Sequence, residues 1–357
     1  MDNTVRRLAA AVALSAVTMG ASWNAGAQTA PITITAVTQA GPTLPQYTKV
    51  DIPMLREGLP KATNGKVNVR LFSYPEMSVN GPELIRLVRS GQVDIGAAAL
   101  TSLSGDAPLL DGFDLPGLSA DIPQARKVAD ALVPYANKKL ERFGVKIIAT
   151  YTYTPQTLYC QKPVKRLADL KGLKVRVPGP ALGTLIESFG GQGVSLAFGE
   201  TYTALERGTV DCAITGMSSG NGVKWYEVTS SLYSLPIAGS TAGYLVNLAW
   251  WNKLDPAIRE TLEKTFAQVQ DAQWNLGEEA NTDAIACNTG NAAQCKLGSV
   301  ATRKPMVESK PYEGDVEALR KVLIEKLLPA WVARCGEECA NVFNTSISPI
   351  TGVSYKK

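Results

Sequence analysis

One arginine of this sequence occupies a position where a charged side chain needs a partner. Arg176 stands between Val175 and Val177, in a short run that Pro178 ends at once. Alternation along a strand places Arg176 on the opposite face from both valines, and strands covered by helices are buried on both faces. A buried guanidinium needs an anion, and its planar fork matches a carboxylate. The pattern therefore indicates a carboxylate ligand, an internal ion pair with Asp or Glu, or an exposed edge position.

Other kinds of site chemistry are limited by composition. The chain has no histidine, which excludes Ser-His-Asp and Cys-His catalysis. It carries no nucleophile elbow, phosphate-binding loop or dinucleotide fingerprint, so we expect no cofactor. Carboxylate pairs could still do acid–base work, so a secreted enzyme stays open as an alternative. The net charge of +4 is spread evenly and no basic run contains interleaved aromatics, so we expect no nucleic-acid partner.

The six cysteines favour disulfides over a metal site. Cys287 and Cys295 flank a turn-like segment, and Cys335 and Cys339 are four residues apart. Six cysteines allow 15 pairings, of which we favour the two local bridges 287–295 and 335–339, with Cys160 joined to Cys212. A zinc site is the alternative, but the chain has no Cys-x-x-Cys pair and no histidine to support it. We expect no metal.

The amino terminus has the composition of an export signal. Arg6 and Arg7 precede an apolar stretch, Leu8 to Met19, and Ala25-Gly26-Ala27 forms a small-x-small cleavage site. The apolar stretch is too short to span a membrane. We therefore expect residues 1–27 to be a signal peptide and the mature protein to reside in a bacterial periplasm.

Two internal echoes predict the scaffold that positions Arg176. Residues 83–97 and 200–215 both run Glu, seven residues, Gly-x-Val-Asp and a short apolar stretch. A second repeat relates residues 65–69 to the strand expected at Lys174–Val177, which pairs Asn68 with Arg176. Two similar α/β lobes in one chain imply a cleft between them, and such clefts commonly hold small ligands.

Periodicity supplies the remaining elements. We expect strands at 32–37, 67–72, 93–100, 145–151, 174–177, 210–214 and 244–248, and helices at 53–61, 82–90, 123–143, 181–189, 200–207, 256–286 and 316–328, the last ended by Pro329. The helix from Pro256 would be about 45 Å long, enough to run along both lobes. Lobe I would comprise 28–152 plus about 242–270, and lobe II 153–241 plus about 271–357, with hinges near 151–153 and 241–244.

Several motifs together resemble those of the periplasmic solute-binding proteins of tripartite ATP-independent periplasmic (TRAP) transporters. The matching stretches are Leu167–Pro178 (LADLKGLKVRVP), Phe198–Leu205 (FGETYTAL), Gly208–Asp211 (GTVD), Ala62–Val67 (ATNGKV) and Ser90–Asp94 (SGQVD). The resemblance covers about residues 32–286. It implies an α/β, two-lobed periplasmic binding protein fold (type II-like), with hinge strands and a long lobe-spanning helix. It also implies capture of a solute by closure of the lobes and delivery to TRAP membrane permease subunits, without catalysis.

The resemblance also assigns site residues. It implies that Arg176 holds the carboxylate of a small organic acid. From the first lobe, the expected ligand-binding residues are Gln39, which follows the first strand, and Ala99, which lies in the lobe-I wall. From the second lobe, Phe198 precedes the helix expected at 200–207, and Thr215 stands where the family often has Asn. Gln156 stands where some members have a second arginine. We also expect Tyr153 and Tyr151 to contact the ligand, because both lie beside the expected hinge. Because polar and cationic groups are fewer here than in the family pattern, a monocarboxylate with an apolar body is favoured over a dicarboxylate or a sialic acid. A ligand-presenting co-sensor for a membrane kinase is the alternative function.

Overall fold

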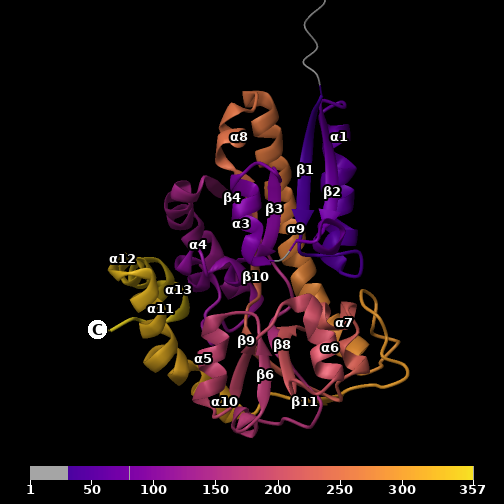
Figure 1. Cartoon of the computed structure of the whole chain (residues 1–357), viewed down its shortest axis with the longest axis vertical. Coiled ribbons are helices and arrows are strands. Elements are labelled where there is room, and N and C mark those ends of the chain that lie inside the picture. The colour runs from indigo at the N-terminus through magenta and orange to yellow at the C-terminus, as the bar shows by residue number, and fades with distance from the viewer. Residues whose placement is uncertain (1–30, 80, 357) are drawn as a thin grey trace, which may run out of the picture. The chain divides into compact units, whose positions relative to one another are not determined.

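Two β-sheets flanked by helices build the described part of the chain (Figure 1). The computed structural model describes residues 31–79 and 81–356. The predicted signal peptide, 1–27, lies outside these residues. The first sheet has the strand order β2-β1-β3-β10-β4, and the second has the order β11-β9-β5-β8-β6-β7. The expected mixture of helices and strands is therefore confirmed.

The first sheet combines strands from two distant parts of the chain. Its strands are β1 (Ile32–Thr38), β2 (Val67–Ser73), β3 (Ile95–Ala99), β4 (Val145–Thr152) and β10 (Thr241–Asn247). Strands β1, β2 and β3 are parallel, whereas β10 is antiparallel to both of its neighbours, β3 and β4. Helix α3 (Leu84–Arg89) packs on β3, and α4 (Ile122–Leu140) packs on β4. Asp121 caps α4 by accepting a hydrogen bond from the Gln124 amide at 2.7 Å.

The second sheet repeats this arrangement and adds an edge strand. Its strands are β5 (Gln156–Cys160), β6 (Lys174–Val177), β7 (Gln192–Ser195), β8 (Cys212–Gly216), β9 (Ser231–Ala238) and β11 (Val307–Ser309). Strand β6 is parallel to β7 and β8, and β5 runs antiparallel between β8 and β9. Helices α5 (Pro180–Ser188) and α6 (Thr201–Glu206) connect β6, β7 and β8. The sequence patterns did not predict β5, β7, β9 and β11 as strands.

Two short connections join the sheets. Residues 153–155 lead from β4 to β5, and residues 239–240 lead from β9 back to β10. Each sheet thereby receives an antiparallel strand that enters directly from the other sheet. The hinge predicted near 151–153 and 241–244 falls at these two connections; its motion stays a prediction.

The topology corrects one of the two sequence echoes. In register, Ala36 of β1 faces Ile95 of β3, as Val175 of β6 faces Cys212 of β8. Strand β6 therefore corresponds to β1, and the edge strand β2 corresponds to β7. The pairing of Asn68 with Arg176 was wrong. A Lys-Val dipeptide stands at the start of both β2 and β6, but β2 is an edge strand and β6 is an inner strand. The residue of lobe I equivalent to Arg176 is Val37.

The Gly-x-Val-Asp echo has a structural cause that is the same in both sheets. Asp94 accepts a hydrogen bond from the Thr35 amide at 2.8 Å, and its own amide donates to the Thr35 carbonyl at 3.0 Å. Asp211 makes the same pair of bonds with Lys174, both at 2.8 Å. Each aspartate therefore fixes the register of a parallel strand pair at its amino-terminal end.

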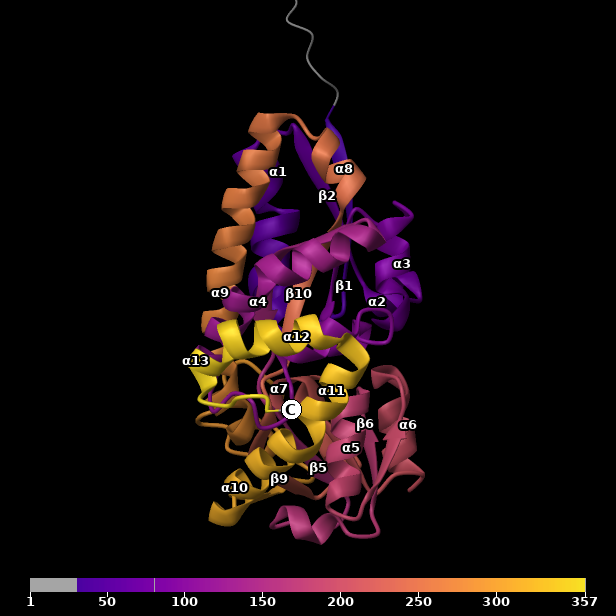
Figure 2. The same ribbon diagram turned by 90° about the vertical axis from the view of Figure 1, so that its left-hand side faces the viewer.

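The long helix α9 (Pro256–Asn288) contacts both sheets (Figure 2). It begins where Asp255 accepts hydrogen bonds from the Ala257 and Ile258 amides, with Pro256 at the first helical position. Towards the first sheet, Gln273 donates to Asp51 and to the Tyr244 hydroxyl, both at 3.0 Å. At the other end, Asn288 donates to the Tyr159 hydroxyl of β5 at 2.8 Å. The predicted lobe-spanning helix is therefore present.

Two prolines do not act as predicted. Pro53 lies inside a π-helix, Gln46–Arg56, instead of opening a helix. Pro329 does not end the helical segment: it lies in α11 (Leu328–Cys335), which continues directly from the π-helical turn Leu323–Leu327. Helix α12 (Glu337–Val342) and α13 (Ser348–Thr351) follow. This carboxyl-terminal segment packs against α4 (Figure 2), whereas α10 (Glu313–Val322) contacts α5.

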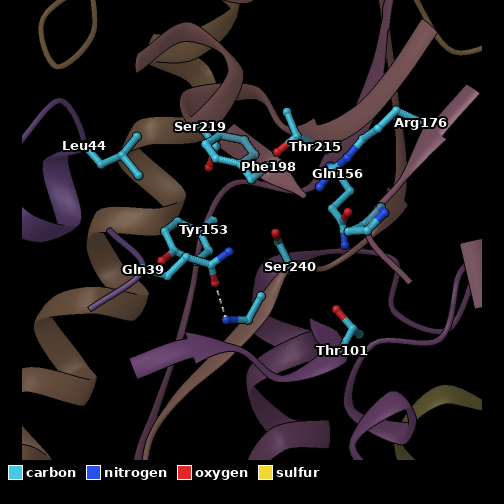
Figure 3. Close-up of a pocket in the computed structure, with 12 residues that line it drawn as sticks. Gln39, Leu44, Thr101, Tyr153, Gln156, Arg176, Phe198, Thr215, Ser219 and Ser240 are labelled. Carbon is cyan, nitrogen blue, oxygen red and sulfur yellow. Dashed lines mark hydrogen bonds between the residues drawn. The ribbon is translucent and has the colours of Figure 1, made fainter. Parts of the chain in front are cut away.

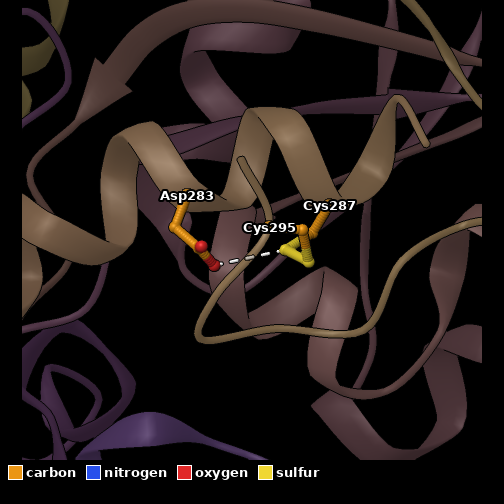
Figure 4. A group of neighbouring side chains, drawn as sticks. All are labelled: Asp283, Cys287 and Cys295. Carbon is orange, nitrogen blue, oxygen red and sulfur yellow. Dashed lines mark hydrogen bonds between the residues drawn. A yellow bond between two sulfur atoms is a disulfide. The ribbon is translucent and has the colours of Figure 1, made fainter. Parts of the chain in front are cut away.

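All three predicted disulfides are present: Cys160–Cys212, Cys287–Cys295 and Cys335–Cys339. The first joins directly opposed residues of β5 and β8, with 4.1 Å between the Cα atoms. The second lies beside Asp283 (Figure 4). That carboxylate accepts hydrogen bonds from the amides of Lys296, Leu297 and Gly298. Asp283 and the disulfide together hold the loop after α9 in place.

Among residues 31–79 and 81–356, no helix combines the length and apolar character that crossing a bilayer requires.

Candidate functional site

A cavity of about 60 Å³ lies where the two sheets meet (Figure 3). Its lining comprises Gln39, Leu44, Ala99, Thr101, Tyr153, Gln156, Arg176, Pro178, Phe198, Thr215, Ser219 and Ser240. The parallel strands β1, β3, β6 and β8 all direct their carboxyl ends to it, as expected for a ligand site in an open α/β sheet. All seven residues predicted from the sequence, Gln39, Ala99, Tyr153, Gln156, Arg176, Phe198 and Thr215, lie on this one cavity. Their contact with a ligand stays a prediction.

Arg176 is buried, with 4% of its surface exposed. Its Nε donates to the Leu196 carbonyl at 3.0 Å, and Nη1 donates to the Ile214 carbonyl at 2.9 Å. Those two carbonyls belong to the segment after β7 and to β8, the strands on either side of β6. The neighbouring strands therefore hold the guanidinium in one orientation. A guanidinium has five N–H groups. Two of them make these bonds, so three remain available to another partner.

No carboxylate of residues 31–79 and 81–356 forms an ion pair with Arg176. Burial lowers the pKa of Arg176 to about 10, so the guanidinium keeps its charge at neutral pH. The internal ion pair and the exposed position, both left open by the sequence, are thus not what the structure contains. The other recorded contact of the guanidinium is the Phe198 ring, whose centroid lies 6.0 Å from Cζ. A buried charge with only neutral partners is unfavourable unless an anion reaches it.

Gln39 and Ala99 form the wall contributed by the first sheet. Gln39 follows β1, and its backbone N–H donates to the Ala97 carbonyl at 2.9 Å. Its side-chain Oε1 accepts a hydrogen bond from the Ala99 amide at 2.7 Å (Figure 3). The side chain of Gln39 is therefore tied to the end of β3.

Gln156 is tied to a buried carboxylate. Its Nε2 lies 3.3 Å from Oδ2 of Asp114, which also accepts the Ser240 amide at 2.8 Å. Oδ1 of Asp114 accepts the Gly239 amide. Burial raises the pKa of Asp114 to about 7, although the hydrogen bonds that it accepts act in the opposite direction. Asp114 thus links the 239–240 connection to a residue of the cavity.

The remaining predicted residues provide aromatic and hydroxyl groups. Tyr153 shares a hydrogen bond with Tyr151, the hydroxyl oxygens being 3.1 Å apart. Tyr151 itself is buried in the core of the first sheet and is not among the lining residues. Phe198 is half-buried and rests on Trp225, with ring centroids 5.4 Å apart. Burial also raises the pKa of Tyr153, so its hydroxyl is neutral.

Five lining residues were not predicted as site residues: Leu44, Thr101, Pro178, Ser219 and Ser240. Pro178 stands two residues after Arg176 and could have been inferred from that spacing. Ser240 lies in the connection between β9 and β10, and Ser219 lies in α7 (Met217–Gly222), directly after β8. Because β9 was not predicted, no sequence pattern placed Ser240 at the junction of the sheets.

Comparison with known families decides the class of protein. Residues 36–309 match the family model described as bacterial extracellular solute-binding protein, family 7. The chain belongs to this family. It is a TRAP-type solute-binding protein, as its motifs predicted, and the family consists of substrate-binding proteins and not of enzymes.

Individual relatives agree with this assignment. The 2,3-diketo-L-gulonate-binding periplasmic protein of Escherichia coli is 28% identical over 224 residues, covering 62% of this chain and 68% of the relative. A TRAP solute-binding protein from Desulfovibrio salexigens, solved with bound orotic acid, has a TM-score of 0.77 at 23% identity and covers 89% of this chain and 99% of its own. A Bordetella pertussis extracytoplasmic solute receptor that binds pyroglutamic acid has a TM-score of 0.77 at 23% identity, covering 90% and 100%. The two-lobed binding-protein fold is thereby confirmed.

Proposed function

We propose that this receptor captures a small organic acid in the cavity between its sheets, with the ligand carboxylate on Arg176, and delivers it to TRAP permease subunits. The observation that supports the proposal most strongly is the burial of Arg176 beside a cavity, with no ion-pair partner among the described residues. A ligand carboxylate would supply the missing anion and accept two of the three remaining N–H groups. The receptors of known structure named above bind acids, which agrees with this role.

The lining favours one carboxylate. Arg176 is the one charged residue among the twelve that line the cavity, so a second carboxylate would find no cationic partner there. Leu44, Ala99, Pro178 and Phe198 offer apolar surface to the carbon body of a ligand. A monocarboxylate therefore fits the described lining better than a dicarboxylate.

Location and delivery belong to the same proposal. The signal sequence of residues 1–27 would export the chain to the periplasm, where family members act. The two connections at 153–155 and 239–240 would allow the lobes to close around the acid. Closure would then present a single conformation to the permease.

Thermal unfolding against a panel of organic acids tests the capture step. An acid present at 100 times its Kd should stabilise the protein by about 2.7 kcal/mol. We expect monocarboxylates to raise the melting temperature and neutral amides of the same acids to leave it unchanged. If no acid of the panel stabilises the protein at millimolar concentration, the proposal fails. Uptake into vesicles that contain the permease subunits, with and without the receptor, tests delivery.

A further inference from the structure

The two glutamines of the cavity are fixed in opposite orientations. A backbone N–H can only donate, so the atom of Gln39 that receives the Ala99 amide at 2.7 Å must be the carbonyl oxygen Oε1. The NH₂ group of Gln39 is then left for the cavity, and Figure 3 shows the amide nitrogen of Gln39 directed away from the dashed hydrogen bond that its oxygen accepts. Gln39 therefore presents a hydrogen-bond donor.

Gln156 presents the opposite group. The carboxylate of Asp114 already accepts the backbone amides of Gly239 and Ser240. An ionised carboxylate only accepts, so the atom of Gln156 that faces it at 3.3 Å must be the NH₂ nitrogen. The carbonyl oxygen Oε1 of Gln156 accepts no hydrogen bond described between residues 31–79 and 81–356. That oxygen is left as an acceptor on the lining of the cavity.

The other polar groups of the lining are adaptable. The hydroxyls of Thr101, Tyr153, Thr215, Ser219 and Ser240 can each donate or accept after a rotation. They can adjust to many ligands and therefore discriminate little. The amides of Gln39 and Gln156 cannot turn round without losing their hydrogen bonds to Ala99 and Asp114. Discrimination between ligands of the same shape thus falls to the two glutamines.

We propose that Gln39 and Gln156 select a monocarboxylate whose body carries both a hydrogen-bond acceptor and a hydrogen-bond donor, as in a small cyclic amide acid. This rests on the proposed function, in which Arg176 takes the carboxylate. Arg176 and Gln156 both come from the second sheet. The hydrogen-bond donor of the ligand body therefore lies next to the ligand carboxylate, where it meets Oε1 of Gln156. The acceptor lies on the far side and meets the NH₂ of Gln39, from the first sheet. Apolar ring faces then pack against residues such as Phe198 and Leu44.

A ligand without these groups would leave a fixed amide unpaired. A buried donor or acceptor without a partner is unfavourable, and sites built to hydrogen-bond a ligand discriminate strongly against analogues that lack the bond. An acid with an entirely apolar body would leave both glutamines unpaired. The ligand favoured by this geometry is therefore more polar at its edges than the apolar-bodied acid expected from the sequence.

Three five-membered ring acids test the inference by calorimetry at pH 8.5, where Asp114 is ionised. Pyroglutamate carries a ring N–H and a carbonyl. In 5-oxotetrahydrofuran-2-carboxylate an oxygen replaces the N–H, and cyclopentanecarboxylate lacks both groups. We expect pyroglutamate to bind most tightly, the lactone about 10- to 100-fold more weakly, and cyclopentanecarboxylate more weakly still.

Matched variants assign the preference to each glutamine. In Gln156→Met, which keeps the length of the side chain without a hydrogen-bonding group, pyroglutamate and the lactone should bind within about 3-fold of each other. In Gln39→Met the preference for the N–H should persist, while the preference for the carbonyl over cyclopentanecarboxylate should diminish. Melting temperatures measured alongside identify a variant that fails to fold, and the wild-type series then decides alone.

The outcomes separate this inference from the proposed function. Equal affinity of the wild type for all three acids, or a preference for cyclopentanecarboxylate, overturns the inference and leaves the role of Arg176 untouched. Binding of none of the three also overturns it, because a cyclic amide acid is the class proposed. The wider acid panel with Arg176→Ala judges the proposed function independently.

Discussion

The two lobes use the same framework of strands and place different side chains at equivalent positions. Strands β2-β1-β3 correspond to β7-β6-β8, and Asp94 and Asp211 fix equivalent strand pairs. Val37 in β1, fully buried in apolar surroundings, is the counterpart of Arg176 in β6. The opposed residues Ile95 and Val246 of the first sheet are the counterparts of the disulfide Cys212–Cys160. The comparison indicates that the same framework stabilises both lobes, whereas only the second lobe has a buried guanidinium at this position.

The largest expected effect concerns Arg176. Arg176→Ala should reduce the affinity for a carboxylate ligand by about 30- to 4000-fold, since losing a buried charged partner weakens binding by roughly 2–5 kcal/mol. Arg176→Lys should also weaken binding, because an ammonium group lacks the planar fork. Calorimetry with a stabilising acid measures both variants.

The equivalent change in the other lobe is the matched control. Val37→Ala removes buried apolar surface, so the melting temperature should fall while the affinity changes by less than about 3-fold. Unchanged affinity in Arg176→Ala, together with a lower melting temperature, would instead make Arg176 a structural residue and remove the functional difference between the lobes.

The disulfide of the second lobe should contribute the next largest effect. Cys160 and Cys212 are 52 residues apart, so replacing both with alanine should lower the free energy of unfolding by about 4 kcal/mol in the chain-entropy account. Cys335 and Cys339, four residues apart, should contribute only about 2 kcal/mol. Urea unfolding of the two double variants gives the comparison. Equal losses would show that loop length does not govern these bridges.

Asp94→Ala and Asp211→Ala test whether the frameworks are energetically equivalent. Each variant loses one hydrogen bond between a carboxylate and a strand amide, a contact of about 2 kcal/mol. The two aspartates make the same pair of backbone bonds, so the two losses in urea unfolding should agree within about 0.5 kcal/mol. A difference of more than about 1.5 kcal/mol would contradict the equivalence of the two strand pairs.

The smallest expected effect is a pH dependence of stability that arises in the first half of the chain. Burial raises the pKa of both Asp51 and Asp114 from 3.8 to about 7. Between these values the native state binds more protons than the unfolded state, so stability rises as the pH falls through 7 towards 4. Each group should add about 1 kcal/mol between pH 7 and pH 6.

Asp51→Asn isolates one of these two groups. An asparagine oxygen can still accept the hydrogen bonds from Tyr244 and Gln273 that Asp51 accepts. Melting curves of this variant should therefore retain about half of the rise in stability between pH 7 and pH 6. A slope identical to that of the wild type would show that Asp51 has an ordinary pKa.

The same comparison explains what could be predicted from the sequence. The Gly-x-Val-Asp repeat could be recognised in the sequence because the same strand register requires an aspartate at the same place in both lobes. Arg176 could be predicted as a site residue because a cationic side chain between two valines is unusual in a buried strand. The assignment of β2 as the counterpart of β6 failed because edge and inner strands can begin with the same Lys-Val dipeptide, and only pairing distinguishes them.

Residues at the junction of the sheets were harder to predict. Ser240 lies in a two-residue connection whose position depends on β9 and β10 belonging to different sheets. Asp114 has no periodic pattern around it, and its contacts with Gly239, Ser240 and Gln156 are long-range. Such contacts arise from tertiary structure, so local patterns contain no signal for them.

The exchange of strands between the sheets has a consequence for folding. Strand β10 lies inside the first sheet, between β3 and β4, yet it follows β9 in sequence; β5 lies inside the second sheet, yet it follows β4. The first sheet therefore cannot be completed until residue 247 is available, after every strand of the second sheet except β11. A fragment cut at either connection would expose an unpaired inner edge, which favours aggregation. The two lobes are thus obliged to fold as one cooperative unit.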